Sequence, residues 1–281
     1  MIAMKNKEYN KKIFERVNNF KRMERLQDFI LSNRELDEII KLHQTTTWER
    51  PIKNQMVSNE LLHWLTLAEN VSSYPLVVEE TVELSSHYTD LPKNKTSHRD
   101  FNNDYAFEYS QFSNILFNSF GKREDGHRNY ASAGGLYPIT PLLIVIDIKS
   151  LPFLKEPGVY IYDSSDHQLL LLTKFTTEKI NAYKDSLIFD DIFDEDEVPK
   201  LAMAYMVDIG KSITKYKNRG YRHALIEVGL MAQSFRNELW KYDNLGECCW
   251  SGFNDNRLAF NLGLSPRLAP IIMMQWFGAV K

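Results

Sequence analysis

The pattern of apolar and polar residues predicts a helical first third, followed by a region of mixed helices and strands. Residues 1–45 and 60–68 show helical periodicity, although the first of these stretches is mostly polar. Residues 109–120 can form a helix with one apolar face, made of Phe112, Ile115, Leu116 and Phe120. A longer helix is expected over residues 221–242, with one face made of Leu225, Val228, Ala232, Phe235 and Leu239.

Several later segments have the length and composition of strands. Residues 142–148 form a continuous, β-branched apolar run that is typical of a strand inside a sheet. Residues 158–162 and 168–172 flank a short polar stretch, which predicts a hairpin. Two further strands are expected over residues 201–210 and 270–277. The order of elements indicates an α+β fold with a mainly antiparallel sheet flanked by helices.

Composition and charge exclude several classes of protein. The chain has 281 residues, of which 43% are apolar and 25% charged, so it can bury a sizeable core. The formal net charge of −3 argues against nucleic-acid or membrane binding by bulk charge. No apolar run approaches the ~20 residues of a membrane-spanning helix. Cys248 and Cys249 are adjacent, which excludes a disulfide framework. We therefore expect a cytoplasmic protein.

Common catalytic motifs are missing from the sequence. It contains no GxxxxGK[ST], GxGxxG, GxSxG or HExxH pattern. The seven histidines are spaced too irregularly to form a ligand set, so no metal site is expected. Residues 190–197 carry six carboxylates in eight positions, for which a solvated loop is favoured over a cation site.

The N-terminal region differs in character from the rest of the chain. Between Met1 and Arg25, eight Lys or Arg residues face three Glu residues. A solvated helix or a protein-docking arm explains this bias better than nucleic-acid binding does, given the overall charge. Residues 71–101 are polar and loop-like, which favours a boundary near residues 85–95.

The segment Ser132–Ile139 is the first candidate for chemistry. Its two consecutive glycines, Gly134 and Gly135, can adopt positive φ and bring bare backbone against a ligand. An ordinary Gly-Gly turn would have the same sequence, so a ligand platform is favoured only in combination with other segments.

Residues 95–101 offer a candidate phosphate site. In an extended chain, side chains alternate, so Lys95, Ser97 and Arg99 would lie on one side. Two cations and a hydroxyl suit a phosphate group, and the arginine supplies a planar fork of donors. A surface strand of no function can look the same.

Two further segments combine aromatic residues with glycine or basic residues. Residues 215–222 interleave Lys, Arg and Tyr around Gly220 and lead into the long helix. A partly buried Lys215 crowded by Arg219 would be a usable general base, whereas a solvated basic turn would be inert. Residues 250–254 place Gly252 between aromatic residues, where its backbone could contact a flat ring.

Four of these segments together resemble the SagB/McbC-type dehydrogenases, which are FMN-dependent and nitroreductase-like. The segments are SAGGLYPI at 132–139, KYKNRGYRHALIEVGLMAQ at 215–233, WSGFND at 250–255 and APIIMMQWFG at 269–278. The resemblance covers roughly residues 95–281 and is faint over the first 90. It implies an FMN-binding domain over residues 91–281. Residues 1–90 form an N-terminal helical extension, and their basic, amphipathic character and lack of a cofactor motif favour a partner-docking role.

The resemblance also implies roles for individual residues. It assigns Lys95, Ser97 and Arg99 to the flavin phosphate and ribityl chain. Ser132, Gly134 and Gly135 would line the flavin and substrate pocket, and the backbone of Gly252 would contact the flavin near N5. Lys215 and Tyr216 match the pair that the family uses in catalysis.

The function implied is oxidation of thiazolines and oxazolines to thiazoles and oxazoles in a ribosomally synthesised precursor peptide. Aromatising an azoline removes two electrons, which no side chain can accept, so a redox cofactor is needed. The partners implied are the peptide, the cyclodehydratase subunits of a synthetase complex, and a second copy of the chain joined through the long helix. Two alternatives remain open: a general NAD(P)H-dependent nitroreductase or flavin reductase, and a non-catalytic scaffold subunit.

Overall fold

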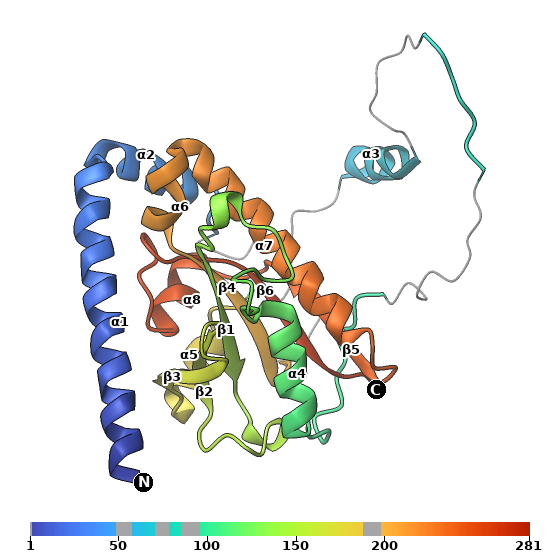
Figure 1. Ribbon diagram of the computed structural model, residues 1–281. Coiled ribbons are helices and arrows are strands. Elements are labelled where there is room, and N and C mark those ends of the chain that lie inside the picture. Colours follow the sequence, from blue (N-terminus) through green and yellow to red (C-terminus); the bar gives the residue numbers. More distant parts are fainter. Residues whose placement is uncertain (1, 49–57, 71–78, 86–95, 188–197) are drawn as a thin grey trace.

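A six-stranded antiparallel sheet forms the centre of the molecule (Figure 1). The computed structural model describes residues 2–48, 58–70, 79–85, 96–187 and 198–281. The strands are β1 (Ile139–Val145), β2 (Gly158–Asp163), β3 (Gln168–Lys174), β4 (Leu201–Val207), β5 (Leu245–Trp250) and β6 (Ile271–Ala279). Their order in the sheet is β3-β2-β1-β4-β6-β5, and every neighbouring pair is antiparallel. The predicted α+β class and sheet type are confirmed.

Alternation along the strands divides the core into two layers. Leu143 and Val145 of β1 face one layer, while Leu142 and Ile144 face the other, as the period of two in a strand requires. Helices α4 (Tyr109–Phe120) and α7 (Asn218–Leu239) cover the first face. Helices α5 (Thr177–Lys184) and α8 (Asp255–Asn261) cover the second. Both faces of the sheet are thus buried, which explains its nearly continuous apolar strands.

The N-terminal region is helical, as predicted. It contains α1 (Ile2–Ile30), α2 (Asn33–Gln44) and α3 (Asn59–Asn70). A capping box begins α2, in which the side chains of Ser32 and Glu35 bond each other's backbone N–H groups. In Figure 1, α1 runs along one side of the molecule and α3 lies apart from the sheet.

Helix α2 belongs to the same core as the sheet. Ile39 and Ile40 are buried within the layer beneath α7, and His43 Nδ1 lies 2.8 Å from the hydroxyl of Tyr221 on α7. Helix α2 is therefore packed against the helices that follow β4. The expected boundary near residues 85–95 lies almost entirely outside the described residues.

The predicted helix over 221–242 begins earlier and is preceded by a separate short helix. Helix α6 (Ile209–Tyr216) ends just before Lys217. The φ of Lys217 is +52°, which is not helical and separates α6 from α7. Gly220 allows the two helices to pack closely, because a Cβ atom there would overlap the backbone of Ser212. The buried face of α7 differs by one position from the predicted one: Ala224 is buried, and Leu225 is 39% exposed.

Two predicted strands are displaced at one end. Strand β1 begins at Ile139 rather than 142 and ends at Val145, after which residues 148–150 form a 3₁₀ turn. Strand β4 ends at Val207, because the Asp208 side chain accepts a hydrogen bond from Lys211 N and caps α6. The acidic run over 190–197 lies outside the described residues. None of the helices in the described part of the chain has the length and hydropathy of a membrane span.

Candidate functional site

The glycine turn (residues 132–137) meets the end of α6. Gly134 and Gly135 have φ values of +63° and +67°, in the left-handed region that favours glycine. A Cβ atom on Gly134 would lie 2.6 Å from Lys215 Nζ and closer still to the Tyr216 hydroxyl. The predicted glycine segment and the predicted lysine–tyrosine pair are therefore brought together in space, although 80 residues separate them in the sequence.

The amine–phenol pair (Lys215 and Tyr216) is partly open to solvent. Lys215 is exposed and its Nζ lies 5.2 Å from the centre of the Tyr216 ring, while Tyr216 is half-buried. The Tyr216 ring also contacts the ring of His223 edge-on, at 5.1 Å between centroids. The helix break at Lys217 lies between Lys215 and Arg219, so the two are not one turn apart on a single helix. Of the two alternatives that the sequence leaves open, Lys215 is exposed rather than partly buried.

A buried carboxyl group supports the glycine turn from α7. Glu227 is 2% exposed, and its Oε2 lies 2.5 Å from the hydroxyl oxygen of Ser132. Burial raises the pKa of Glu227 to about 7, against the opposing effects of the Ser132 hydrogen bond and of Arg128 and Lys211. The sequence analysis did not single out Glu227, which lies in the middle of a helical motif and could be recognised only from its contact with Ser132.

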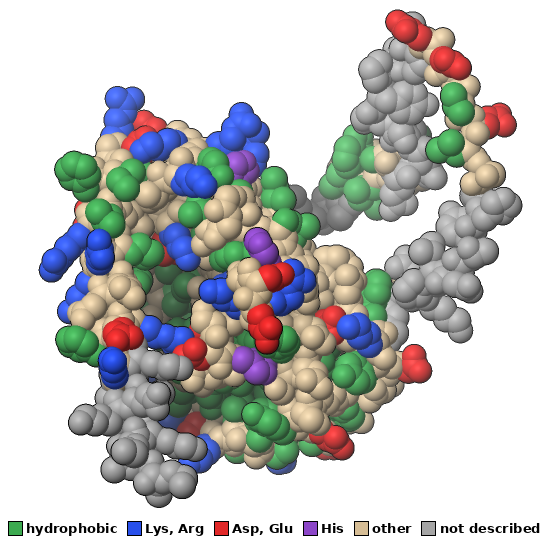
Figure 2. Space-filling view, viewed as in Figure 1, with side chains coloured by type: hydrophobic (Ala, Val, Ile, Leu, Met, Phe, Trp, Pro, Cys, Tyr) green, Lys and Arg blue, Asp and Glu red, His purple; other side chains and the backbone are tan. Residues whose placement is uncertain are grey.

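A groove between α1 and α6 opens beside the amine–phenol pair. It has a volume of about 370 Å³ and is mostly apolar. Met23, Leu26 and Ile30 of α1 line one side, and Thr214 and Lys215 of α6 line the other. Figure 2 shows Lys and Arg side chains spaced along the edge of the molecule that α1 forms. An extended, mainly apolar ligand lying in this groove would contact Lys215.

The predicted phosphate segment lies along the edge of the sheet. The edge segment (residues 96–101) runs beside β5, where His98 N donates to Glu247 O at 2.9 Å. Gly246 makes room for it, because a Cβ atom there would lie 2.6 Å from His98 Cδ2. Ser97 and Arg99 are exposed, and Lys281 Nζ, bonded to Asp100 at 2.6 Å, brings a further cation beside them. Lys95 lies outside the described residues.

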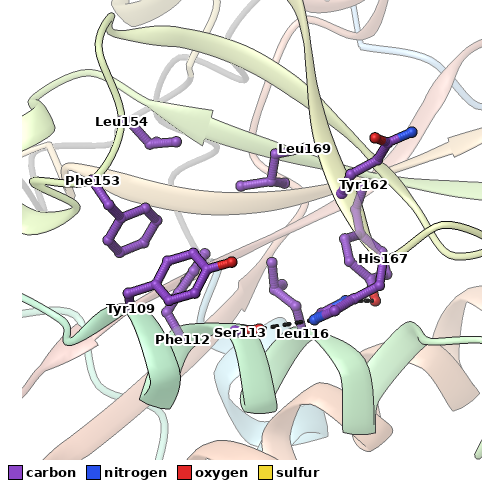
Figure 3. Close-up of a pocket in the computed structure, with 10 residues that line it drawn as sticks. Tyr109, Phe112, Ser113, Leu116, Phe153, Leu154, Tyr162, His167 and Leu169 are labelled. Carbon is purple, nitrogen blue, oxygen red and sulfur yellow. Dashed lines mark hydrogen bonds between the residues drawn. The ribbon is translucent and has the colours of Figure 1, made fainter. Parts of the chain in front are cut away.

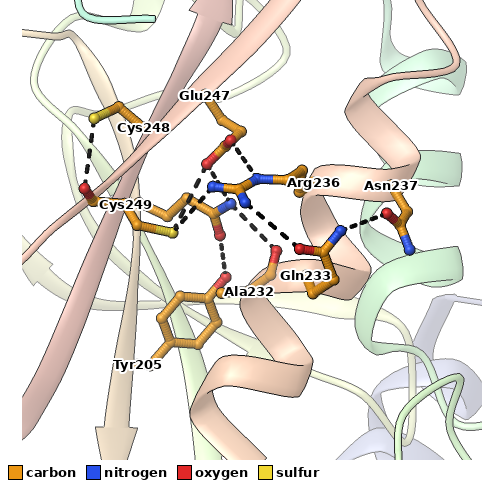
Figure 4. A network of polar contacts seen from close by, with 9 residues as sticks. Tyr205, Ala232, Gln233, Arg236, Asn237, Glu247, Cys248 and Cys249 are labelled. Atoms are coloured by element: carbon orange, nitrogen blue, oxygen red, sulfur yellow. Dashed lines mark hydrogen bonds and ion pairs between the residues drawn. The ribbon is translucent and has the colours of Figure 1, made fainter. Parts of the chain in front are cut away.

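Behind the edge segment, a buried polar network joins β4, β5, β6 and α7 (Figure 4). Glu247 is 2% exposed, and its carboxylate accepts hydrogen bonds from Arg236 Nε at 2.5 Å and from Gln275 Nε2 at 2.7 Å. Gln275 Oε1 in turn accepts a hydrogen bond from the Tyr205 hydroxyl. A buried charge with these partners is compensated, and the network fixes β5 relative to α7. No pattern along the chain predicts this network, because its members come from four separate elements.

The remaining predicted residue, Gly252, lies in the loop after β5. Its carbonyl accepts a hydrogen bond from Trp250 Nε1 at 2.8 Å, and the Trp250 ring stacks on Trp276. The loop is therefore held by an aromatic pair. The predicted residues thus come from the glycine turn before β1, the edge segment beside β5 and the loop after β5.

A separate cavity lies between α4 and the β2–β3 hairpin (Figure 3). It has a volume of about 260 Å³. At its edge, His167 joins Ser113 through Nε2 and Tyr162 through Nδ1, each at 2.8 Å. A nucleophilic triad needs a carboxylate on the second imidazole nitrogen, and Tyr162 occupies that position instead. Burial also lowers the pKa of His167. The trio does not have the chemistry of a hydrolase.

Comparisons with known proteins show similarity in sequence and in fold. No family model matches the sequence. The chain is 29% identical over 171 residues to the microcin B17-processing protein McbC of Escherichia coli, a match that covers 59% of this chain and 60% of McbC. The sequence match thus spans about three fifths of this relative.

Solved structures extend the similarity over more of the chain. A chain of the E. coli microcin synthetase McbBCD complex, bound to truncated pro-MccB17, superposes with a TM-score of 0.76 at 23% identity, covering 91% of this chain and 96% of that one. A nitroreductase candidate of Ralstonia eutropha superposes with a TM-score of 0.53 at 17% identity, covering 72% of this chain and 89% of that one. The protein therefore has the nitroreductase-like fold and resembles McbC in both sequence and fold.

Proposed function

We propose that the protein is an FMN-dependent dehydrogenase that oxidises thiazolines and oxazolines to thiazoles and oxazoles in a ribosomally synthesised precursor peptide. The observation that carries the proposal is the meeting of Lys215, Tyr216 and Gly134. An amine and a phenol converge there on bare backbone, which suits proton removal from a flat ring held against the turn. The similarity to McbC supports the same chemistry.

The residues present fit a flavin mononucleotide. Gly134 and Gly135 leave open backbone that a side chain would fill, and the neighbouring His223 has a buried Nδ1 without a hydrogen-bond partner among the described residues. Ser97 and Arg99, with Lys281 nearby, supply the cations and hydroxyl that a phosphate needs. We assign to the same cofactor Lys95, Ser132 and the backbone of Gly252. When bound, FMN supplies the two-electron acceptor that aromatisation requires.

In this proposal, the amine–phenol pair handles the proton. The azoline ring must lose a proton from carbon, and Lys215 Nζ is the base at the glycine turn. The amine is exposed in the protein alone, and a flavin and a peptide bound against the turn would shield it from water. Tyr216 is half-buried against His223, so its hydroxyl is held in place and orients the amine. Neither residue needs a metal ion to act.

The peptide substrate would enter through the groove between α1 and α6. Its apolar side chains suit the neutral heterocycles and small side chains of an extended peptide, and Lys215 is one of its lining residues. A peptide in this groove would contact α1. This contact favours a substrate-binding or partner-docking role for residues 1–90 beside the FMN-binding domain over residues 91–281.

We also propose that two copies of the chain pair through α7. Its outer face carries exposed Leu225, Ile226 and Leu230, at 39%, 56% and 41% exposure. Gly229 lies between them with open space where a Cβ would stand, which allows two helices to approach closely. The cyclodehydratase subunits would then dock on the exposed apolar residues of α1, such as Phe14 and Phe20.

The deciding experiment is the absorption spectrum of the purified protein, the mass of the cofactor it releases, and turnover of an azoline-containing peptide. The expected result is a yellow protein that releases FMN and converts azolines with a loss of two mass units per ring. Rapid NAD(P)H turnover without azoline oxidation would identify a general nitroreductase instead. A colourless protein that binds the peptide complex would identify a scaffold subunit.

A further inference from the structure

None of the roles proposed above involves Glu227. Its side chain is buried beneath the glycine turn, and its Oε1 has no hydrogen-bond partner among the described residues. Burying a carboxyl group with one unpaired oxygen costs free energy that an apolar residue of the same size would not cost. Packing therefore does not explain why an acid stands here.

The one hydrogen bond that Glu227 makes leads directly into the turn. The Ser132 hydroxyl accepts a hydrogen bond from the backbone N–H of Tyr137, at 2.8 Å. A hydroxyl has a single hydrogen, and that of Ser132 is left to be donated to Glu227 Oε2, 2.5 Å away. Ser132 thus closes the turn from its first residue to its last, and Glu227 fixes the orientation of the serine.

The groups that face Glu227 hold the same turn from other sides. Lys211 Nζ donates to the Tyr137 carbonyl at 3.1 Å, and the Arg128 guanidinium lies 4.2 Å from the centre of the Tyr137 ring. Tyr137 itself has a φ of +47°, an unfavourable conformation for a residue with a side chain. A strained turn of this kind persists only where its surroundings fix it.

We propose that Glu227 is a positioning residue, which sets the 132–137 backbone through the Ser132 hydroxyl and so places Gly134 against Lys215 and Tyr216. The link to catalysis rests on the proposed function, since the glycine turn is the part of the pocket where flavin and azoline are expected to meet. The link to the turn itself rests only on the hydrogen bonds above.

Two substitutions separate positioning from packing. Glu227→Gln keeps an oxygen that can accept the Ser132 hydroxyl, whereas Glu227→Met has a similar size and helix propensity but no such acceptor. With flavin saturating, we expect Gln to retain kcat for azole formation within about threefold and Met to lose about tenfold, the loss that corresponds to one hydrogen bond. Glu238→Gln, on the same helix and away from the turn, serves as the matched control. If Glu227 only fills space, Met equals or exceeds Gln.

A second readout does not depend on activity. Amide hydrogen exchange at Gly135 and Tyr137 reports on the turn directly, because both N–H groups bond to Ser132, at its carbonyl and hydroxyl respectively. We expect exchange at Tyr137 to accelerate about tenfold in Glu227→Met and to stay near the wild-type rate in Glu227→Gln. Ser132→Ala removes the same link from the other side, so it should accelerate exchange as well if Glu227→Met fails to fold.

These measurements distinguish the two proposals from each other. If the wild-type protein binds no flavin and forms no azole, the proposed function fails, while the exchange rates still decide what Glu227 does to the turn. If flavin binds and azoles form but Met and Gln exchange and react at equal rates, the positioning role is overturned. Adding Ser132→Ala to Glu227→Met should cost little more than either change alone, since both act on one contact.

Discussion

Lys215 and Tyr216 approach the same backbone atom from adjacent positions at the end of α6. A Cβ atom added to Gly134 would meet the amine of one and the hydroxyl of the other. The amine also lies 5.2 Å from the centre of the phenol ring. The last two residues of α6 therefore hold the proposed base and its neighbouring phenol at one point of the glycine turn.

The first prediction concerns the amine. Lys215→Ala should lower the rate of azole formation about 10²–10⁴-fold, which is the usual contribution of a general base. The protein should stay folded and keep its flavin, because Lys215 is exposed. Mass spectrometry of the peptide, with flavin content matched between variants, measures the rate. Lys179→Ala, an exposed lysine on α5, is the control, and full activity of Lys215→Ala would refute the assignment.

The two glycines of the turn provide a matched pair for the second prediction. Both have positive φ, so Gly134→Ala and Gly135→Ala should each cost about 1 kcal/mol in stability from backbone strain. A methyl group at Gly134 also displaces Lys215 and Tyr216, whereas at Gly135 it meets nothing within 4 Å. Gly134→Ala should therefore lose azole formation well beyond Gly135→Ala, at equal flavin content. Equal losses in the two variants would show that the approach of the amine–phenol pair is unimportant.

The third prediction is a dependence of stability on pH. Because burial raises the pKa of Glu227 from 4.5 to about 7, the native state binds its proton more tightly than the unfolded state does. The stability that this proton contributes is present below pH 4.5 and is lost as the pH rises towards 7. Glu227→Gln has no such proton. Its free energy of unfolding, relative to that of the wild type, should therefore rise by up to about 3 kcal/mol between pH 4.5 and pH 8.

Denaturant unfolding of both proteins across this pH range measures the difference. Burial also raises the pKa of Asp208 and Asp255. Both proteins share these residues, so their effects cancel in the comparison. Stability curves that run parallel from pH 4.5 to pH 8 would contradict the prediction.

The fourth prediction concerns the edge segment. Arg99→Ala should weaken FMN binding about tenfold or more, because a hydrogen bond to a charged group contributes roughly 1.5–3 kcal/mol. Titration of the stripped protein with FMN, followed by quenching of flavin fluorescence, measures the affinity. Arg123→Ala removes an exposed arginine that pairs with Asp125 and should leave the affinity unchanged. Equal affinities for the two variants would move the phosphate site elsewhere.

The features that the sequence predicts best are helices and strands whose bounds follow from local hydrophobic spacing. The helix over 109–120 was predicted with its exact bounds and buried face, since its apolar residues follow helical spacing without interruption. The start of β1 was missed because Pro141 resembles a loop residue. The structure tolerates it in the strand because β2 pairs with β1 only from Leu142 onwards, so no partner on that side needs its missing N–H.

The sequence pattern does not predict contacts between distant parts of the chain. The meeting of Gly134 with the amine–phenol pair was expected only through the family resemblance, since nothing in the spacing connects the two segments. The Ser132–Glu227 contact was missed because it joins residues 95 positions apart, and an acid in an amphipathic helix is normally solvated.

The placement of residues 96–101 along β5 has a consequence for solubility. Strand β5 is at the edge of the sheet, and the segment pairs with it at the bond from His98 to Glu247. An uncovered edge strand offers its N–H and C=O groups to other molecules and promotes aggregation. A residue set that we assign to phosphate binding thus also shields a sheet edge. Variants that detach this segment should form β-rich aggregates while their helices remain intact.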